Sequence, residues 1–316
     1  MKNGLVIKST GSWYEVEDEN GDCFECRIKG SFRIKGIKST NPVAVGDRVK
    51  FTVQQVSGKK ESETTGTIVD ISERKNYIIR KSPNLSKQSH IIAANIDQAI
   101  LVATIDYPVT TTTFIDRYLA SAEAYRIPVL IVLNKTDRYN QAQKTELENI
   151  VNIYETIGYK CVLTSAVTGE GLVMLNEAVR NKINVLSGHS GVGKSTLLNV
   201  LQPGLNLKTD NISDFHKTGK HTTTYSSLFK LNIGGYVIDT PGIKGFGMLE
   251  MEPWEISHYF PEIFKYAQKC RYNNCLHVNE PGCAVKTAVE AGEIAGSRFA
   301  SYSGLLKSDS KYRPAY

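Results

Sequence analysis

The order of two short motifs constrains the fold of this chain most strongly. Gly188-His189-Ser190-Gly191-Val192-Gly193-Lys194-Ser195 matches the pattern of a phosphate-binding loop, and it lies between an apolar run at 183–186 and a helical pattern at 196–201. Asn134-Lys135-Thr136-Asp137 follows another apolar run, at 128–133, and comes before the loop. In ordinary nucleotide-dependent switches this tetrapeptide comes after the loop. The order here therefore predicts a switch domain whose strands are circularly permuted.

The glycine-rich segment has the residues that a chain of phosphates requires. Its glycines let backbone amides converge on phosphate oxygens, and the N-terminus of the following helix adds a favourable dipole. Lys194 is expected to contact the β- and γ-phosphates, and Ser195 to bind Mg²⁺ through its hydroxyl. A chance glycine-rich turn is the alternative, but the flanking strand and helix patterns argue against it.

The tetrapeptide indicates which base is bound. Asp137 can accept two hydrogen bonds from N1 and N2 of guanine, and an unpaired carboxylate there should reject adenine by roughly 10⁴ or more. Lys135 can lie along the base, while Asn134 can connect this loop to the phosphate loop. Ser165 and Ala166 follow the next apolar strand pattern, where a backbone amide can bind guanine O6. We therefore expect GTP and GDP as ligands.

Two further segments have the character of nucleotide switches. Asp239-Thr240-Pro241-Gly242 can hold Mg²⁺ through water with Asp239, and the Gly242 amide can sense the γ-phosphate. Upstream, Gly219-Lys220-His221-Thr222-Thr223-Thr224 can supply a threonine to the Mg²⁺, and position favours Thr223 or Thr224. The alternative for this run is a polar loop.

The group that would activate water for hydrolysis is not evident. Ile243 occupies the position after Gly242, where well-known switches have a water-orienting glutamine. His221 is the first candidate to replace it, although it could equally contact only solvent or a partner. We therefore expect slow intrinsic turnover that a partner accelerates.

Four metal-ligand residues gather near the C-terminus. Cys270, Cys275, His277 and Cys283 are separated by four, one and five residues in a turn-rich stretch. Three thiolates and one imidazole would fill a tetrahedral zinc shell, which is typical of a structural site. Buried free cysteines are the alternative. Cys23 and Cys26 have no second pair, and in a strand they would lie on opposite faces, so we interpret them as packing residues.

Composition and periodicity divide the chain into three domains. Residues 1–75 contain five short strand patterns, which predict a β-barrel of the oligonucleotide-binding (OB) type or a similar SH3-like one. Residues 76–246 alternate strands and helices, which predicts an α/β nucleotide-binding domain with a parallel sheet. Residues 247–316 should form a zinc-binding, mostly helical domain.

The charge distribution favours an RNA partner. The net charge is +6, and the segment 27–38 has five basic residues, no acidic residue and one aromatic residue, Phe32. Such a segment could neutralise phosphates and stack on a base, although a solvated strand face is the alternative. The sequence has no apolar run of membrane-spanning length and no secretion signal. We expect a cytoplasmic monomer without membrane contact.

Together these motifs resemble the ribosome small subunit-dependent GTPase A family over nearly the whole chain. The resemblance implies a cytosolic bacterial GTPase (a phosphoric anhydride hydrolase) that binds the small (30S) ribosomal subunit and its rRNA late in maturation. It implies stimulation by the subunit and release after hydrolysis. It also carries GTP contacts onto residues 134–137 and 188–196, including Thr136 and Thr196, and zinc ligands onto the Cys/His cluster. Lys220 departs from an arginine common in the family, which leaves a phosphate contact there less certain.

Two other functions compete with a hydrolytic switch. One is an RNA- or ribosome-binding checkpoint protein in which GTP only tunes affinity, and the other is an ATP-dependent enzyme, which Asp137 argues against. The permuted order leads directly from Gly242 into the C-terminal domain. We therefore expect nucleotide state to act through that domain, while the barrel supplies much of the RNA binding.

Overall fold

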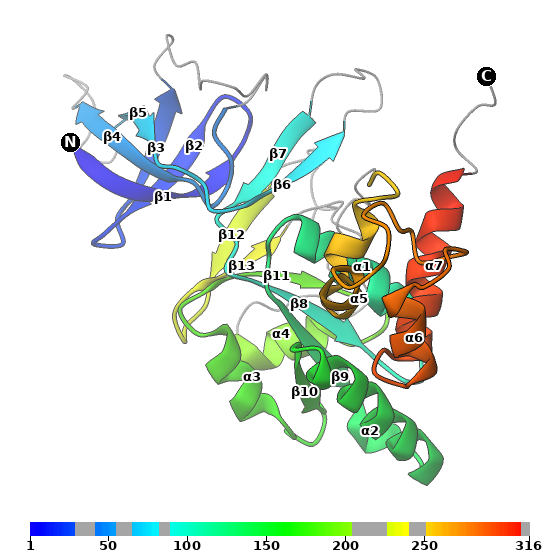
Figure 1. Cartoon of the computed structure of the whole chain (residues 1–316). Helices are drawn as coiled ribbons and strands as arrows, with labels where there is room; N and C mark the ends of the chain where they lie inside the picture. Colours follow the sequence, from blue (N-terminus) through cyan, green and yellow to red (C-terminus); the bar gives the residue numbers. More distant parts are fainter. Residues whose placement is uncertain (29–41, 55–64, 82–88, 204–225, 240–250, 311–316) are drawn as a thin grey trace. The chain divides into compact units, whose positions relative to one another are not determined.

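The computed structural model describes residues 1–28, 42–54, 65–81, 89–203, 226–239 and 251–310 of the 316 residues (Figure 1). The chain divides into two compact units, and each is described by itself. Unit 1 comprises Met1–Gln98, Asn176–Leu186 and Leu198–Ile243, and unit 2 comprises Ala99–Leu175, Ser187–Leu197 and Lys244–Tyr316. Each unit therefore assembles segments that are far apart in the sequence.

The predicted N-terminal barrel is present in unit 1. Its strands are β1 (Lys2–Ser9), β2 (Tyr14–Asp18), β3 (Cys23–Ile28), β4 (Arg48–Gln54) and β5 (Thr65–Ile71). They follow the order β1-β2-β3-β5-β4, and β1 also pairs with β4, which closes the barrel. The pairing of β3 with β5 is parallel and the others are antiparallel. Val6, Val16 and Phe51 are fully buried inside it, as alternating strand patterns require.

Three more strands continue the sheet from the barrel in unit 1. They are β11 (Ile183–Ser187), β12 (Ser226–Lys230) and β13 (Tyr236–Asp239). β11 pairs with β13 in parallel, whereas β12 is antiparallel both to β13 and to β1 of the barrel. The barrel is thus hydrogen-bonded directly to strands of the predicted nucleotide-binding domain.

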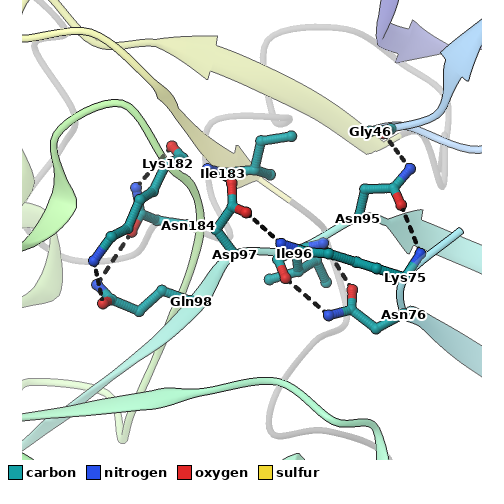
Figure 2. A network of polar contacts seen from close by, with 10 residues as sticks. All are labelled: Gly46, Lys75, Asn76, Asn95, Ile96, Asp97, Gln98, Lys182, Ile183 and Asn184. Atoms are coloured by element: carbon teal, nitrogen blue, oxygen red, sulfur yellow. Dashed lines mark hydrogen bonds and ion pairs between the residues drawn. The ribbon is translucent and has the colours of Figure 1, made fainter.

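A hairpin that the sequence analysis did not predict follows the barrel. Its strands β6 (Tyr77–Lys81) and β7 (Ser89–Ala94) form a separate two-stranded sheet. The side chain of Asn76 closes its base, since Nδ2 donates to Ile96 O at 2.9 Å and Oδ1 accepts from Ile96 N at 2.8 Å. Next to it, Asp97 Oδ2 accepts from Ile183 N at 2.8 Å (Figure 2). The connection from the barrel to β11 is therefore an ordered polar network.

Unit 2 contains the parallel strands expected from the central α/β pattern. They are β8 (Gln98–Ala103), β9 (Val129–Asn134) and β10 (Lys160–Thr164), in the order β10-β9-β8. The helices α1 (Thr112–Ala124) and α2 (Gln141–Thr156) connect them, and α3 (Leu172–Val179) and α4 (Lys194–Leu201) come later in the chain. Every residue of β8 is buried, which suits a strand of a parallel sheet. The carboxyl ends of β9 and β10 are where the predicted base-binding residues begin.

The C-terminal part of unit 2 is mostly helical, as predicted. It consists of the 3₁₀-helix η3 (Ile256–Tyr259) and the helices α5 (Pro261–Ala267), α6 (Ala284–Glu290) and α7 (Gly296–Ser310). Phe260, Ile263, Val285 and Tyr302 form its apolar core together with Ala120 from α1. The C-terminal helices therefore share one core with the central domain.

None of the helices in the described ranges combines the length and the apolarity that crossing a bilayer needs.

Candidate functional site

The predicted phosphate-binding loop begins where β11 ends, and two of its glycines have no space for a side chain. Gly188 has φ +137°, and a Cβ there would lie 2.2 Å from Val102 O. Gly193 has φ +98°, and a Cβ there would lie 2.4 Å from Asn134 Nδ2. Only glycine fits such left-handed, crowded positions. The loop can therefore approach β8 and the Asn134 segment closely.

Lys194 and Ser195 open helix α4 directly after the loop. Lys194 Nζ donates to the carbonyl oxygens of Gly188 and His189 at 2.8 and 2.5 Å, so the ammonium lies over the loop. Burial lowers the pKa of Lys194. Ser195 is buried at the N-terminus of α4. A cation, a hydroxyl and a helix N-terminus thus converge where a phosphate chain would be bound.

Asn134 joins the base-binding segment to the phosphate loop, as the sequence predicts. It is the last residue of β9, and its Nδ2 donates to Val192 O at 2.9 Å. Its Oδ1 accepts from Thr164 Oγ1 at 3.0 Å, which orients the amide. The backbone of Asn134 is fixed as well, because the Tyr139 hydroxyl donates to Asn134 O at 2.5 Å.

Lys135 lies across the same junction. Its backbone is left-handed with φ +67°, and its Nζ donates to Gly191 O at 2.6 Å and to Tyr107 O at 2.5 Å. Burial and the nearby Arg138 lower the pKa of Lys135, although Asp137 opposes this. The aliphatic stem of Lys135 therefore lies between the two loops, where it can cover one face of a base.

Asp137 is held by the loop that follows β10. Ser165 Oγ donates to Asp137 Oδ1 at 2.6 Å and accepts from the amides of Val167 and Thr168 at 3.2 and 3.1 Å. Ser165 is fully buried, whereas Asp137 is exposed. The carboxylate is thus fixed on one side and accessible on the other, and Ala166 follows Ser165 at the same edge.

Several contacts that position these residues were not expected from the sequence. Thr136 Oγ1 donates to Glu170 Oε2 at 2.6 Å, and the rings of Phe114 and His189 lie 3.9 Å apart between centroids. Glu170 lies in a Gly-Glu-Gly segment soon after Ser165, and this pattern only weakly indicates a residue that contacts the base-binding segment. Phe114 lies far from the loop in sequence, and nothing in its neighbourhood pointed to His189.

The predicted switch residues are described only in part. His221, Thr223, Thr224 and Gly242 lie outside the described residues, as does Thr222. Asp239 is the last residue of β13, where its backbone pairs with Ser227, and its side chain is outside the description. Their predicted roles in Mg²⁺ binding and hydrolysis stay predictions.

The four predicted metal ligands meet at one point between α5 and α6. The ligand atoms of Cys270, Cys275, His277 and Cys283 lie within 4.8 Å of one another. Nδ1 of His277 lies 3.6 Å from Cys270 Sγ and 3.4 Å from Cys283 Sγ, and the two sulfurs are 3.9 Å apart. A tetrahedral zinc shell has edges of about 3.6 to 3.8 Å between its ligand atoms. The donor set and its spacing therefore fit zinc.

Glu280 fixes the backbone of the loop that carries His277. Its carboxylate accepts from the backbone amides of Leu276, Val278 and Asn279 at 2.8, 3.0 and 3.0 Å. Burial alone would raise the pKa of Glu280, but these amides hold it below its ordinary value. Burial also lowers the pKa of His277, which favours the neutral ring that a metal requires.

A buried ion cluster joins the C-terminal helices to α1. Arg298 of α7 donates to both carboxylate oxygens of Glu262, at 2.7 and 3.2 Å, and to Asp116 Oδ1 at 2.9 Å. All three residues are almost completely buried, and Tyr154 donates to Asp116 Oδ1 at 2.8 Å. A single cation thus serves two buried carboxylates, and Asp116 Oδ2 has no hydrogen-bond partner among the described residues.

Comparison with known protein families agrees with this geometry. The family model described as RsgA GTPase matches residues 71–249, and the model described as RsgA N-terminal domain matches residues 3–60. The chain belongs to the RsgA GTPase family. GTP hydrolysis is thus the activity of its family, and the resemblance seen in the sequence is confirmed.

Relatives in the RsgA family match over the whole length. The small ribosomal subunit biogenesis GTPase RsgA of Bacteroides fragilis is 56% identical over 315 residues, which cover 99% of each chain. The protein of the same name from Flavobacterium johnsoniae is 54% identical, over 98% of this chain and 94% of its own.

Solved structures of RsgA-like proteins confirm the permuted fold. The crystal structure of YjeQ from Thermotoga maritima superposes with a TM-score of 0.80 at 37% identity and covers 99% of both chains. YloQ, described as a circularly permuted GTPase, superposes with a TM-score of 0.76 at 31% identity over 100% of this chain and 97% of its own.

Proposed function

We propose that this RsgA family member is a GTP hydrolase that acts as a switch in maturation of the small ribosomal subunit and is stimulated by that subunit. The observation that carries the proposal is the contact of Ser165 with Asp137 beside the contact of Asn134 with the phosphate loop. This arrangement suits guanine recognition next to phosphate binding. The names of the full-length relatives support the ribosomal role.

In this proposal the two loops divide the work of nucleotide binding. Asp137 selects guanine with Lys135 on the base and the Ala166 amide near O6, while residues 188–196 bind the phosphates. Ser195, one of Thr223 and Thr224, and Asp239 through water hold the Mg²⁺, which neutralises charge on the phosphates. Gly242 senses the γ-phosphate.

His221 is the proposed residue for orienting or activating the attacking water. Ile243 cannot do so, because its side chain has no polar group. Lys194 stabilises the charge that develops on the transferred phosphoryl group. Turnover should remain slow until the protein binds the ribosomal subunit.

The barrel is the proposed rRNA-binding domain. Arg27 on β3 is exposed, and its guanidinium carbon lies 3.7 Å from the centroid of the Trp13 ring. An exposed cation stacked on an aromatic ring is suited to binding a phosphate beside a base. The rest of the basic segment, with Lys29, Phe32, Arg33, Lys35 and Lys38, lies outside the described residues.

The Cys/His cluster is the proposed site of one structural zinc ion. Zinc would be held by three sulfurs and Nδ1 of His277, and it would stabilise a loop that has few apolar residues of its own. The proposal predicts one zinc per chain, and Cys283→Ala should lose most of it. Retention of full zinc content by that variant would contradict the assignment.

The decisive experiment measures single-turnover GTP hydrolysis with and without small ribosomal subunits, for the wild type and for His221→Ala. We expect the subunits to accelerate the wild type by orders of magnitude and His221→Ala to lose most of that acceleration. Subunit binding without acceleration would favour the checkpoint protein in which GTP only tunes affinity. Tens of turnovers per second without subunits would contradict the proposed switch.

The guanine assignment has its own experiment. Asp137→Asn should weaken GTP binding by roughly a hundredfold or more and should favour xanthosine triphosphate, whose O2 accepts the hydrogen bond that the new amide donates. Affinities for GTP, ATP and xanthosine triphosphate measure this directly. Unchanged preference for GTP would exclude Asp137 as the base-reading residue.

A further inference from the structure

The barrel is in register with the strand that carries Asp239. Ser227 of β12 pairs with Asp239 of β13 on one side and with Lys8 of β1 on the other. Three strands, one of them from the barrel, thus form a continuous row at the position of Asp239. Displacing β1 would change the backbone partner of β12 and, through it, the end of β13.

A buried carboxylate from the barrel contacts the same hairpin three cross-strand rows away from the Ser227–Asp239 pair. Glu17 of β2 is 7% exposed and forms an ion pair with Lys230 of β12. Its Oε2 accepts from Tyr236 Oη at 2.9 Å. Lys230 and Tyr236 are themselves cross-strand partners in the β12–β13 hairpin. One carboxylate therefore contacts both strands that lie between the two predicted switch segments.

We propose that Glu17 is a positioning residue for GTP hydrolysis, because it fixes the register of the β12–β13 hairpin that ends at Asp239. In this proposal Glu17 acts through Lys230 and Tyr236 and not by contact with the nucleotide. The inference rests on the proposed role of Asp239 in Mg²⁺ binding. It makes the barrel part of the catalytic framework as well as an RNA-binding domain.

The segment between β7 and β8 gives the barrel a second connection to the β12–β13 hairpin, through β11. Asn95 Nδ2 donates to Gly46 O of the barrel at 3.0 Å, and Asp97 accepts from Ile183 N of β11 at 2.8 Å (Figure 2). β11 is in turn the parallel neighbour of β13. The barrel is thus connected to β13 from both sides, so that a shift of the barrel is transmitted to the strand instead of being absorbed by a loose linker.

The experiment measures single-turnover GTP hydrolysis as a function of Mg²⁺ concentration in the full-length protein. Glu17→Ala and Tyr236→Phe should each raise the Mg²⁺ concentration for half-maximal rate roughly three- to tenfold, because only part of the worth of a hydrogen bond to a charged group reaches the metal site through the strands. Affinity for GDP in EDTA should stay within about twofold, since the base and phosphate loops are untouched. The double variant should be less than additive, and Glu17→Gln, which keeps an acceptor for Tyr236, should recover part of the loss.

Asp18→Asn is the matched control. Asp18 is 8% exposed and adjacent in sequence, and it pairs with Lys2 of the barrel. Within the described part of the chain it forms no hydrogen bond or ion pair with β12 or β13. It should lower the melting temperature of the barrel and leave the Mg²⁺ midpoint unchanged. If it shifted the midpoint as much as Glu17→Ala, barrel stability would explain the effect and the inference would be wrong.

Asp239→Asn distinguishes failure of the positioning role of Glu17 from failure of the Mg²⁺ role of Asp239. A shift of the midpoint in Asp239→Asn with none in Glu17→Ala would overturn the positioning role and leave the proposed function intact. No shift in Asp239→Asn would overturn the Mg²⁺ role of Asp239 and the inference with it. Circular dichroism of each variant confirms that the fold is retained.

Discussion

Gly193 is one of the residues at which the phosphate loop and the predicted base-binding segment touch. Its φ of +98° excludes most side chains, and the space for a Cβ is occupied by Asn134 Nδ2 at 2.4 Å. Backbone strain and a steric conflict therefore coincide at one position. The two effects can be separated, because Gly158 has the same φ of +98° with no atom within 4 Å of its Cβ position.

Gly193→Ala should abolish tight nucleotide binding, while Gly158→Ala should not. Both variants introduce left-handed strain of about 1 to 2 kcal/mol. Only Gly193→Ala also displaces Asn134, so we expect its GDP affinity to fall by roughly thirtyfold or more, against less than about threefold for Gly158→Ala. Titration with a fluorescent GDP analogue compares them. Equal losses would mean that strain alone determines the effect.

Ser165 determines how well Asp137 is prepared to bind the base. Ser165→Ala removes a hydrogen bond to a carboxylate, which is worth about 1.5 to 3 kcal/mol, and GDP affinity should fall by about tenfold or more. Thr168→Ala, in the same loop, should change the GDP affinity by less than about threefold, because the hydroxyl of Thr168 accepts a long hydrogen bond from Glu170 N at 3.4 Å and does not contact Asp137. Calorimetric titration with GDP distinguishes the two variants. An intact affinity in Ser165→Ala would show that Asp137 is held by other groups.

At the scale of elements, helices α1 and α7 are joined by the buried cluster of Arg298, Asp116 and Glu262. Burial opposes the charge of Arg298, yet the two carboxylates raise its pKa above the ordinary value. The positive charge of Arg298 therefore stabilises the carboxylates of both Glu262 and Asp116. Its removal would leave two carboxylates buried without compensation.

Arg298→Met should destabilise unit 2 by about 3 to 5 kcal/mol, the usual cost of breaking a buried ion pair from one side. Thermal or urea unfolding measures this. Lys269→Met, at an exposed position of the same unit, should stay within about 0.5 kcal/mol. The triple variant with Asp116→Asn and Glu262→Gln should regain part of the loss, and additive losses would contradict the coupling.

How far the sequence predicts these elements depends on how local their signals are. Strands β9 and β10 and the contact of Asn134 with the phosphate loop follow from motifs of a few residues. The closure of the β6–β7 hairpin by Asn76 depends on the backbone of Ile96, twenty positions along the chain, so no local pattern made it evident. The pairing of β1 with β12 joins residues more than two hundred positions apart, and neither strand pattern specifies its neighbour. Phe114, which is distant in sequence from its partner His189, was missed for the same reason.

For the molecule as a whole, the metal cluster and the nucleotide site belong to one cooperative unit. Cys283 packs in the same apolar core as Ala120 of α1, and α1 also places Phe114 against His189 of the phosphate loop. Binding at one site should therefore strengthen binding at the other, and the coupling free energy should be the same in both directions.

GDP should protect the zinc proposed for the Cys/His cluster. At about a hundred times its dissociation constant, GDP should stabilise the folded state by about 2.7 kcal/mol, so zinc loss that requires unfolding of unit 2 should slow by up to about a hundredfold and unit 2 should melt in one transition at higher temperature. Release is followed with a zinc-sensitive dye. Cys23→Ser, outside the cluster, should behave as the wild type. Zinc loss at the same rate with and without GDP would show that the two sites are independent.

The partnership of Asp116 with Arg298 spans 182 positions of the chain. During synthesis, α1 leaves the ribosome long before α7 has been made. Until α7 follows, the Asp116 carboxylate cannot pair with Arg298, which it needs in order to be buried. The central sheet can pair its strands early, but α1 cannot reach its final packing until α7 has emerged. Folding of the nucleotide domain is thus completed only after α7 has been synthesised, so that a chain terminated before α7 should be degraded by the cell's proteases and not persist as an unregulated GTPase.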